Sequence, residues 1–142
     1  MCKDEHWVYG DLRHYNRNPH TEKWTIHDPE IGLETDVDEN TIGQFTGLYD
    51  KNGKEIYEGD ILKYTRTNFK SGHLKKEKIE EIYDVFWNES KHAFYCHTEF
   101  ESGGGASGFL SFKDERAEKN EIEIVGNRFD NPELLKGGEN GR

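Results

Sequence analysis

Short runs of apolar and aromatic residues, separated by turn-forming residues, dominate the hydrophobic pattern of this chain. Such runs, bounded by Gly, Pro, Asn and Asp, are typical of β-strands. The first two, residues 6–15 and 23–27, flank a turn at residues 16–20 and predict a hairpin. Residues 30–40 are acidic and show no period that predicts an element.

The clearest local signal lies in residues 40–64. Asn52 and Gly53 stand between two apolar runs. Because both residue types accept positive φ, they predict a two-residue type I′ hairpin turn. Residues 58–60 predict a second turn, after which residues 61–65 resume as a strand. This succession of strand, hairpin, turn and strand is typical of a small barrel.

The next part of the chain is harder to interpret. Residues 66–78 are polar and basic and predict a loop. Residues 77–87 fit both a helical stripe and the alternation of a strand. A turn at residues 88–91, followed by an aromatic run, favours a hairpin over residues 82–100. Residues 101–108 are rich in Gly and Ser and predict a second loop.

The C-terminal part ends in one strand and one helical turn. Residues 121–125 alternate as a half-buried edge strand does. Asn131 is placed as an N-cap, and Pro132 occupies the first helical position. We expect Leu134 and Leu135 to dock this turn over the exposed end of the sheet, because a bare edge strand invites aggregation.

Together these elements predict a mainly β fold, namely a small SH3-like or partly open β-barrel with hairpin extensions and a short C-terminal helical turn. A chain of 142 residues has the size of one domain. Residues 1–136 are therefore predicted to form a single β-rich domain. Residues 137–142 are polar and Gly-rich and are predicted to be a disordered tail.

Composition narrows the possible partners. Charged residues make up 34% of the chain, and the formal net charge is −10. A strongly acidic surface opposes nucleic-acid binding, which needs a cationic face, but it permits mimicry of DNA. The two cysteines, Cys2 and Cys96, form no disulfide framework, which favours a reducing compartment. With no long apolar run and no signal-peptide core, the protein is expected in the cytoplasm, without membrane contact.

Two blocks carry an order and spacing of residues that composition does not explain. Residues 41–61 contain TIGQFTG, DKNGK and IYEGDI, and residues 124–135 contain IVGN and NPELL. With WVYGDL at residues 7–12, they resemble the YopX family of small proteins encoded by phages and prophages. The resemblance implies a compact β-rich domain in the cytoplasm of a bacterial host and supplies no catalytic residue. The residues we assign to turns and packing in these blocks are Gly43, Gly47, Asn52, Gly53, Glu58, Gly59, Asp60, Gly126, Asn131 and Pro132.

Two patterns could carry chemistry, and each has a structural interpretation that we favour. The glycines within residues 103–108 satisfy the spacing of a dinucleotide-binding loop, but that loop must be followed by a helix, and a strand is expected here. Glu58 and Asp60 are close enough to form a carboxylate pair that acts as a general base or binds magnesium. We favour carboxylates that accept backbone N–H groups in a turn.

Thiol and imidazole groups give no stronger signal. His92, Cys96 and His97 are the tightest group among seven histidines and two cysteines. In a strand, His97 points away from the face that His92 and Cys96 share, so neither a metal site nor a cofactor is expected. Cys96 lies in an aromatic strand, where a neutral thiol is commoner than an activated thiolate. No catalytic motif is found, and we predict that the protein is not an enzyme.

Aromatic side chains give the one functional indication. There are more of them than a thin core can hold, and exposed aromatics on a rigid strand are typical of partner-binding surfaces. Tyr49, Tyr57 and Tyr95 are the predicted binding residues. The favoured function is a non-enzymatic protein-binding module that acts on a host or phage protein. The alternatives are a small-molecule-binding or sequestering protein with a pocket in a homo-oligomer, and an acidic DNA mimic.

Overall fold

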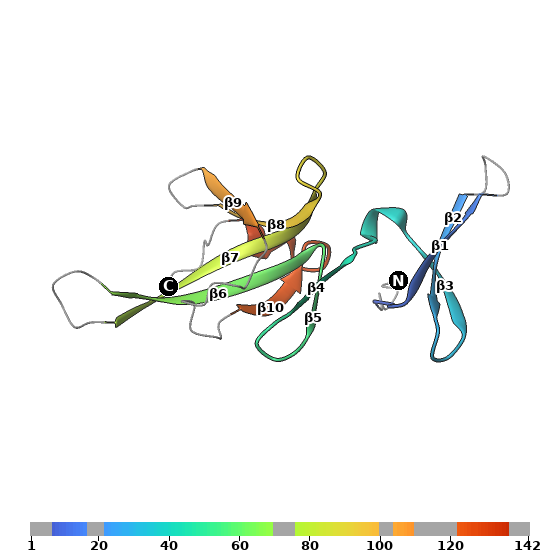
Figure 1. Ribbon diagram of the computed structural model, residues 1–142, viewed down its shortest axis with the longest axis horizontal. Coiled ribbons are helices and arrows are strands. Elements are labelled where there is room, and N and C mark those ends of the chain that lie inside the picture. The colour runs from blue at the N-terminus through green and yellow to red at the C-terminus, as the bar shows by residue number, and fades with distance from the viewer. Residues whose placement is uncertain (1–6, 17–21, 70–75, 100–103, 110–121, 137–142) are drawn as a thin grey trace. The chain divides into compact units, whose positions relative to one another are not determined.

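The computed structural model describes residues 7–16, 22–69, 76–99, 104–109 and 122–136. Strands dominate this part of the chain, so the predicted mainly β fold is confirmed (Figure 1). Contacts divide the chain into two compact units, Met1–Ile42 and Gly43–Arg142, which are called unit 1 and unit 2 below. This division was not anticipated from the sequence.

Unit 1 contains one antiparallel sheet of three strands in the order β1-β2-β3. Its strands are β1 (Asp11–Asn16), β2 (Glu22–Asp28) and β3 (Leu33–Val37), and the short 3-10 helix η1 (Glu39–Thr41) follows them. The predicted first hairpin is confirmed, although its first strand begins at Asp11. The prediction missed β3, because its three apolar or β-branched positions are separated by acids in a segment that is acidic overall.

The register of this sheet separates an apolar face from a polar one. Leu12 lies opposite Ile26, and Trp24 lies between His14 and Val37. Since side chains alternate along a strand, these residues share one face. Most of the charged side chains lie on the other face, where the Thr25 and Tyr15 hydroxyls both donate to the Glu34 carboxylate at 2.7 and 2.8 Å.

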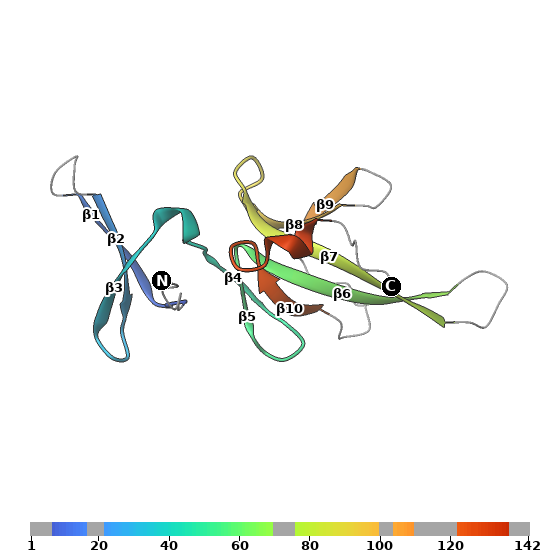
Figure 2. The same cartoon turned by 180° about the vertical axis from the view of Figure 1, so that it is seen from behind.

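Unit 2 is built on an antiparallel five-stranded sheet in the order β10-β6-β7-β8-β9, seen from behind in Figure 2. Its strands are β6 (Asp60–Phe69), β7 (Lys76–Asn88), β8 (Ala93–Glu99), β9 (Gly105–Phe109) and β10 (Ile122–Asn127). The predicted hairpin near residues 82–100 and the predicted last strand are confirmed. The ambiguous segment 77–87 is a strand throughout.

Two predicted loops are in part strands. Strands β6 and β7 remain paired as far as Phe69 and Lys76, within the segment predicted as a polar loop. Strand β9 begins at Gly105, inside the predicted Gly/Ser loop, and pairs with β8. Neither segment shows an apolar alternation in its sequence. Both can still form strands, because backbone hydrogen bonds alone can extend a strand pair beyond the core. The glycines at residues 105 and 108 therefore lie in a strand and do not form a phosphate-binding loop.

A separate two-stranded sheet, β4 (Phe45–Tyr49) with β5 (Glu55–Tyr57), confirms the predicted second hairpin. The predicted type I′ turn is wrong. The Asp50 N–H donates to the Lys54 carbonyl at 2.8 Å, which leaves a three-residue loop, and the Gly53 N–H donates to the Asp50 carbonyl at 3.0 Å. In this turn only Gly53 has a positive φ, of +79°. A three-residue hairpin loop needs one left-handed residue at its end, so Asn52 need not adopt that conformation.

The hydrophobic core lies in unit 2. Ile56, Leu62 and Val85 are buried together, and partly buried side chains surround them: Leu48, Tyr83, Ile122 and Ile124. The core thus joins the β4–β5 hairpin to three strands of the five-stranded sheet. The described strands form three separate sheets and no closed barrel, so the SH3-like barrel predicted from the sequence is not confirmed.

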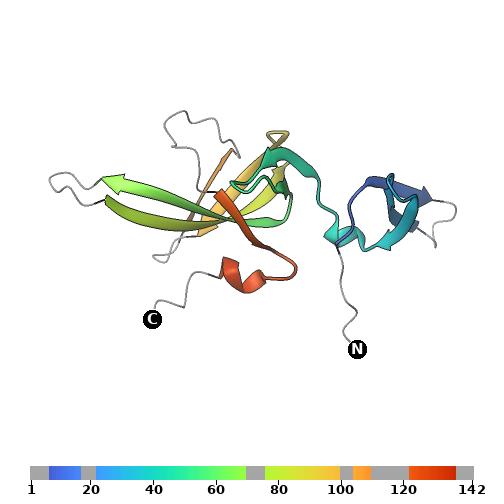
Figure 3. The same ribbon diagram turned by 90° about the horizontal axis from the view of Figure 1, so that it is seen from below.

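The predicted C-terminal helical turn exists as a 3-10 helix, η2 (Pro132–Leu135), which follows β10 (Figure 3). The expected side-chain cap is wrong. The Asn131 side chain makes no cap hydrogen bond to the helix, and its Oδ1 instead accepts from the Asn127 N–H at 3.4 Å. The helix lies against β7, a central strand, where Leu134 is 37% exposed and Leu135 is half-buried. A four-residue helix presents only one narrow face.

Candidate functional site

The β4–β5 hairpin has one face in the core and one face outside it. Ile56 is fully buried, and Leu48 packs against the core beside it. Phe45 lies directly opposite Tyr57 across the strand pair, as Tyr49 lies opposite Glu55. The alternation that buries Ile56 therefore turns its neighbours Glu55 and Tyr57 to the other side.

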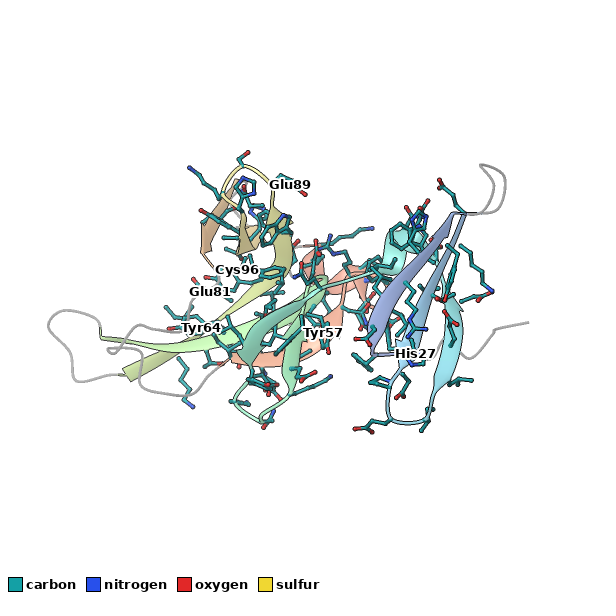
Figure 4. All side chains as sticks on the ribbon, turned by 45° about the vertical axis from the view of Figure 1, so that its right-hand side comes forward. His27, Tyr57, Tyr64, Glu81, Glu89 and Cys96 are labelled. Atoms are coloured by element: carbon teal, nitrogen blue, oxygen red, sulfur yellow. The ribbon has the colours of Figure 1, made fainter. Side chains whose placement is uncertain are left out.

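Three aromatic rings gather on this outer face. The ring of Phe45 lies 5.6 Å from that of Tyr49 and 5.5 Å from that of Tyr57, as measured between centroids. We call Phe45, Tyr49 and Tyr57 the hairpin aromatic cluster; Figure 4 labels Tyr57 within it. Tyr49 is 53% exposed, and a Cβ added at Gly47, between Phe45 and Tyr49 on β4, would meet no atom within 4 Å. The cluster thus offers apolar surface next to open space.

A carboxylate borders the cluster. The Tyr57 hydroxyl donates a hydrogen bond of 2.7 Å to Glu55 Oε2, and both residues lie on β5. The Glu55 side chain is exposed. An aromatic surface with an adjacent carboxylate favours cationic groups, because ring faces and carboxylates both attract positive charge.

The structure brings together two of the three predicted binding tyrosines. Tyr49 and Tyr57 contact the same phenylalanine, whereas Tyr95 lies on β8 in the five-stranded sheet. There its ring is 6.1 Å from that of Phe86 on the neighbouring strand. Tyr95 is half-buried and belongs to a different surface from the hairpin aromatic cluster.

Glu58 and Asp60 each accept a backbone N–H group. The Asp60 carboxylate accepts from the Tyr57 N–H at 2.8 Å, and Glu58 Oε1 accepts from the Trp87 N–H at 3.3 Å. Burial raises the pKa of the Asp60 carboxyl above its usual value, although the bond from Tyr57 acts in the opposite direction. The two carboxylates thus point to different strands, an arrangement that serves the turn and does not form a paired ligand set. In the part of the chain described, no three His, Cys, Asp or Glu side chains are grouped to hold a metal ion.

Asp50 is the residue that sequence reasoning missed. It is 8% exposed, its Oδ1 accepts from the N–H groups of Asn52 (2.8 Å) and Lys54 (3.0 Å), and its Oδ2 accepts from the Ile124 N–H at 3.2 Å. Burial acts to raise the pKa of this carboxyl, but the backbone donors outweigh it, and the pKa lies below its usual value. Asp at the first position of a turn was a visible signal. The hydrogen bond that Asp50 accepts from β10 has no signal in the sequence.

The neighbouring Lys51 completes the attachment of the hairpin to β10. Its N–H donates to the Ile122 carbonyl at 2.9 Å, and its ammonium group lies 2.6 Å from the Glu123 carboxylate. The tip of the hairpin is therefore fixed to the sheet, and the hairpin aromatic cluster has a rigid support.

Some of the glycines assigned to packing stand where a side chain would collide. A Cβ at Gly126 would overlap the Asn131 side chain, and one at Gly43 would overlap the Glu58 carbonyl. Gly59 has a φ of +92°, and its carbonyl accepts from the Arg128 N–H at 2.8 Å. The hydrogen bond from Arg128 ties the 58–60 turn to the segment after β10.

Cys96 and His97 are adjacent on β8 and have different surroundings. Burial raises the pKa of the Cys96 thiol, which disfavours the nucleophilic thiolate. His97 Nδ1 lies 2.7 Å from the Ser107 hydroxyl on the adjacent strand. A Cβ at Gly105 would collide with the His97 ring, so this imidazole lies over β9.

These features define a class: a small, mainly β protein with two units and an exposed aromatic hairpin fixed to its larger sheet. A sequence model of the YopX protein family matches residues 1–136, and the chain belongs to the YopX family. No curated protein and no solved structure matches the chain. Within the described residues, no helix is long and apolar enough to span a membrane.

Proposed function

We propose that this protein is a non-enzymatic protein-binding module, encoded by a phage or prophage, which contacts a host or phage protein through the hairpin aromatic cluster. The observation that carries the proposal is the arrangement of Phe45, Tyr49 and Tyr57, whose rings lie together on the hairpin face opposite the core. Aromatic residues supply much of the binding energy of protein interfaces.

Rigidity supports this choice of surface. Binding costs less when the contact residues are already ordered. The hairpin is held to β10 by Asp50 and Lys51, and it contributes Ile56 to the core. Its aromatic rings are therefore presented in a fixed arrangement before a partner arrives.

The charge around the cluster indicates the kind of segment it binds. Glu55 is exposed beside Tyr57, and the formal net charge of the chain is −10. A partner segment with Lys or Arg would place a cation against the ring faces and near the carboxylate. We therefore propose a basic segment of the partner protein as the ligand.

Affinity capture from host cells tests the proposal with three forms of the protein. Tyr49→Ala removes the most exposed ring of the cluster, and Tyr15→Ala removes an exposed tyrosine from a strand of unit 1. The proposal expects a partner, identified by mass spectrometry, that binds the wild type and Tyr15→Ala and binds Tyr49→Ala about tenfold or more weakly. Equal binding by Tyr49→Ala, with an unchanged melting temperature, would reject this surface.

The charge of the ligand is tested with the captured partner. Glu55→Gln keeps the size of the side chain and removes its charge, and Glu89→Gln makes the same change in the exposed β7–β8 turn. We expect Glu55→Gln to weaken binding severalfold at low salt and Glu89→Gln to have little effect, because screening limits distant charges. Equal effects of the two variants would leave the aromatic contact standing and reject the basic ligand.

A further inference from the structure

The two edges of the five-stranded sheet differ in what covers them. At one edge, β10 is hydrogen-bonded to the turn of the β4–β5 hairpin: the Lys51 N–H donates to the Ile122 carbonyl, and the Asp50 carboxylate accepts from the Ile124 N–H. At the other edge lies β9, and no further described strand pairs with it. Figure 1 shows β9 and β10 at the two ends of the sheet.

Strand β9 lacks the devices that usually protect an edge. Its sequence is GASGF, with no charged residue and no proline, and residues 105–108 are exposed. Natural edge strands commonly carry charges, proline or bulges that prevent further pairing, because their outward N–H and C=O groups can otherwise bind other strands. A Cβ at Gly108 would meet no atom within 4 Å, so the face of the sheet is also open at this position.

The edge strands of unit 1 provide an internal comparison. Strand β1 carries Asp11 and Arg13, and β3 carries Glu34 and Asp36. Pairing of two copies through β3 would bring carboxylates together, which is unfavourable. Strand β9 has no such penalty, although the formal net charge of the whole chain is −10.

We infer that the outer edge of β9 pairs with β9 of a second copy of this chain. A two-fold axis places the two strands antiparallel, so that each copy uses the same surface. In the dimer, the outer strand at each end of the joined sheet is β10. Residues 122–124 of β10 are already hydrogen-bonded to the β4–β5 hairpin and cannot pair with a further copy, so assembly stops at a dimer. The small residues 105–108 of β9 let the two backbones approach without displacing bulky groups along that stretch.

Hydrogen exchange on the wild-type full chain tests the pairing directly. When the protein concentration is raised from about 10 µM to about 1 mM, exchange at amides of Gly105–Phe109 should slow about tenfold, and sedimentation should show a dimer. Amides of the β7–β8 turn at residues 89–92 should be unaffected. A protein that stays monomeric over this range, or that dimerises without protection of β9, would overturn the inference.

A charge at the edge provides the second arm. Ala106→Lys places like charges close together across the two-fold axis, whereas Ser90→Lys adds the same charge in the exposed turn after β7. We expect Ala106→Lys to weaken the dimer about tenfold or more and Ser90→Lys to leave it nearly unchanged. Circular dichroism checks that both variants fold. If Ala106→Lys folds and dimerises as the wild type does, β9 is not the interface; if it does not fold, hydrogen exchange on the wild type decides.

Discussion

Unit 1 and unit 2 are both antiparallel sheets, but only unit 2 has a buried apolar core among the residues described. All four buried hydrophobic residues, Ile56, Ile61, Leu62 and Val85, belong to unit 2. In unit 1 the one buried residue described is Thr25. Of the nine exposed large hydrophobic side chains that the structure describes, six lie in unit 1: Trp7, Tyr9, Leu12, Tyr15, Ile31 and Leu33.

The comparison of the two units shows that a chain can form paired strands without gaining much stability from buried side chains. Unit 1 is held by backbone pairing and by surface interactions, such as the Lys23–Asp36 ion pair at 2.7 Å and the His14–Trp24 ring stack at 4.1 Å. Exposed ion pairs contribute at most about 1 kcal/mol each. Burial of a large apolar side chain contributes about 1.5–3 kcal/mol, and unit 2 has several such residues. The two sheets should therefore respond differently to the same changes.

Separation of the units should have the largest effect. We expect residues 1–42 alone to be unfolded, because a three-stranded sheet without buried apolar side chains cannot offset its conformational entropy. Residues 43–142 alone should keep dispersed amide signals in a proton–nitrogen NMR spectrum and unfold cooperatively in urea. A folded spectrum from residues 1–42 would show that the comparison between the units is wrong.

Core truncation should distinguish the units in the intact chain. Ile56→Ala is expected to lower the free energy of unfolding by about 3–4 kcal/mol, through lost burial and a cavity. Ile26→Ala, the same change on the half-buried face of unit 1, should cost about 1 kcal/mol. Urea titrations of the two variants test this difference. Equal losses would mean that Ile26 is buried in solution as deeply as Ile56.

Two aspartates in unit 2 should respond oppositely to the same substitution. Asp50→Asn replaces one carboxylate oxygen with an amide donor and so leaves a backbone N–H without an acceptor, which should cost about 2–3 kcal/mol at pH 7. Asp60→Asn removes a buried charge and retains an oxygen for the Tyr57 N–H, so it should stabilise the protein by about 1 kcal/mol.

The pH dependence of the two variants follows from the directions of their pKa shifts. Since the pKa of Asp50 is lowered on folding, its stabilisation is present above about pH 4 and disappears as the pH falls through its folded pKa. The pKa of Asp60 is raised, so its contribution is present below about pH 4 and disappears as the pH rises through its folded pKa. The cost of Asp50→Asn and the gain from Asp60→Asn should therefore both shrink in acid, as measured by urea titration at several pH values. A cost of Asp50→Asn that is independent of pH would show that its charge does not matter.

The smallest effect is expected for Leu134→Ala. Leu134 is 37% exposed on a 3-10 helix, so its truncation should lower the free energy of unfolding by less than about 1 kcal/mol. This value is well below that for Ile56→Ala in the same unit. A loss comparable to that of Ile56→Ala would restore the role of a docking helix that the sequence suggested.

Some features of the fold could be predicted because a local signal is sufficient for them. The hairpin of β4 and β5 follows from two apolar runs around a Gly-containing turn, and β10 follows from its alternation of apolar and acidic residues. The type of that turn was predicted wrongly, because its loop length depends on which residues pair across it. Strands β3 and β9 were missed, since acidic or Gly-rich segments pair through their backbones without an apolar alternation.

For the candidate site, the sequence indicated Tyr49 and Tyr57 but not their common contact with Phe45. It also placed Tyr95 with them, whereas the fold puts that residue on another sheet. Residues near in sequence can be assigned to one face by alternation, but residues on different strands meet only through the order of the sheet. That order, β10-β6-β7-β8-β9, has no local signature.

The sequence by itself determined that this protein is acidic, mainly β and a member of the YopX family, because composition, strand periodicity and motif order are properties of single segments. Only the tertiary structure decided that the buried apolar residues it describes all lie in unit 2, that Asp50 joins the hairpin to β10, and that β9 is the last described strand at one edge of its sheet. Each of these depends on contacts between residues far apart in the chain. Such contacts are selected by the burial and hydrogen bonding of the whole fold, which no single segment encodes.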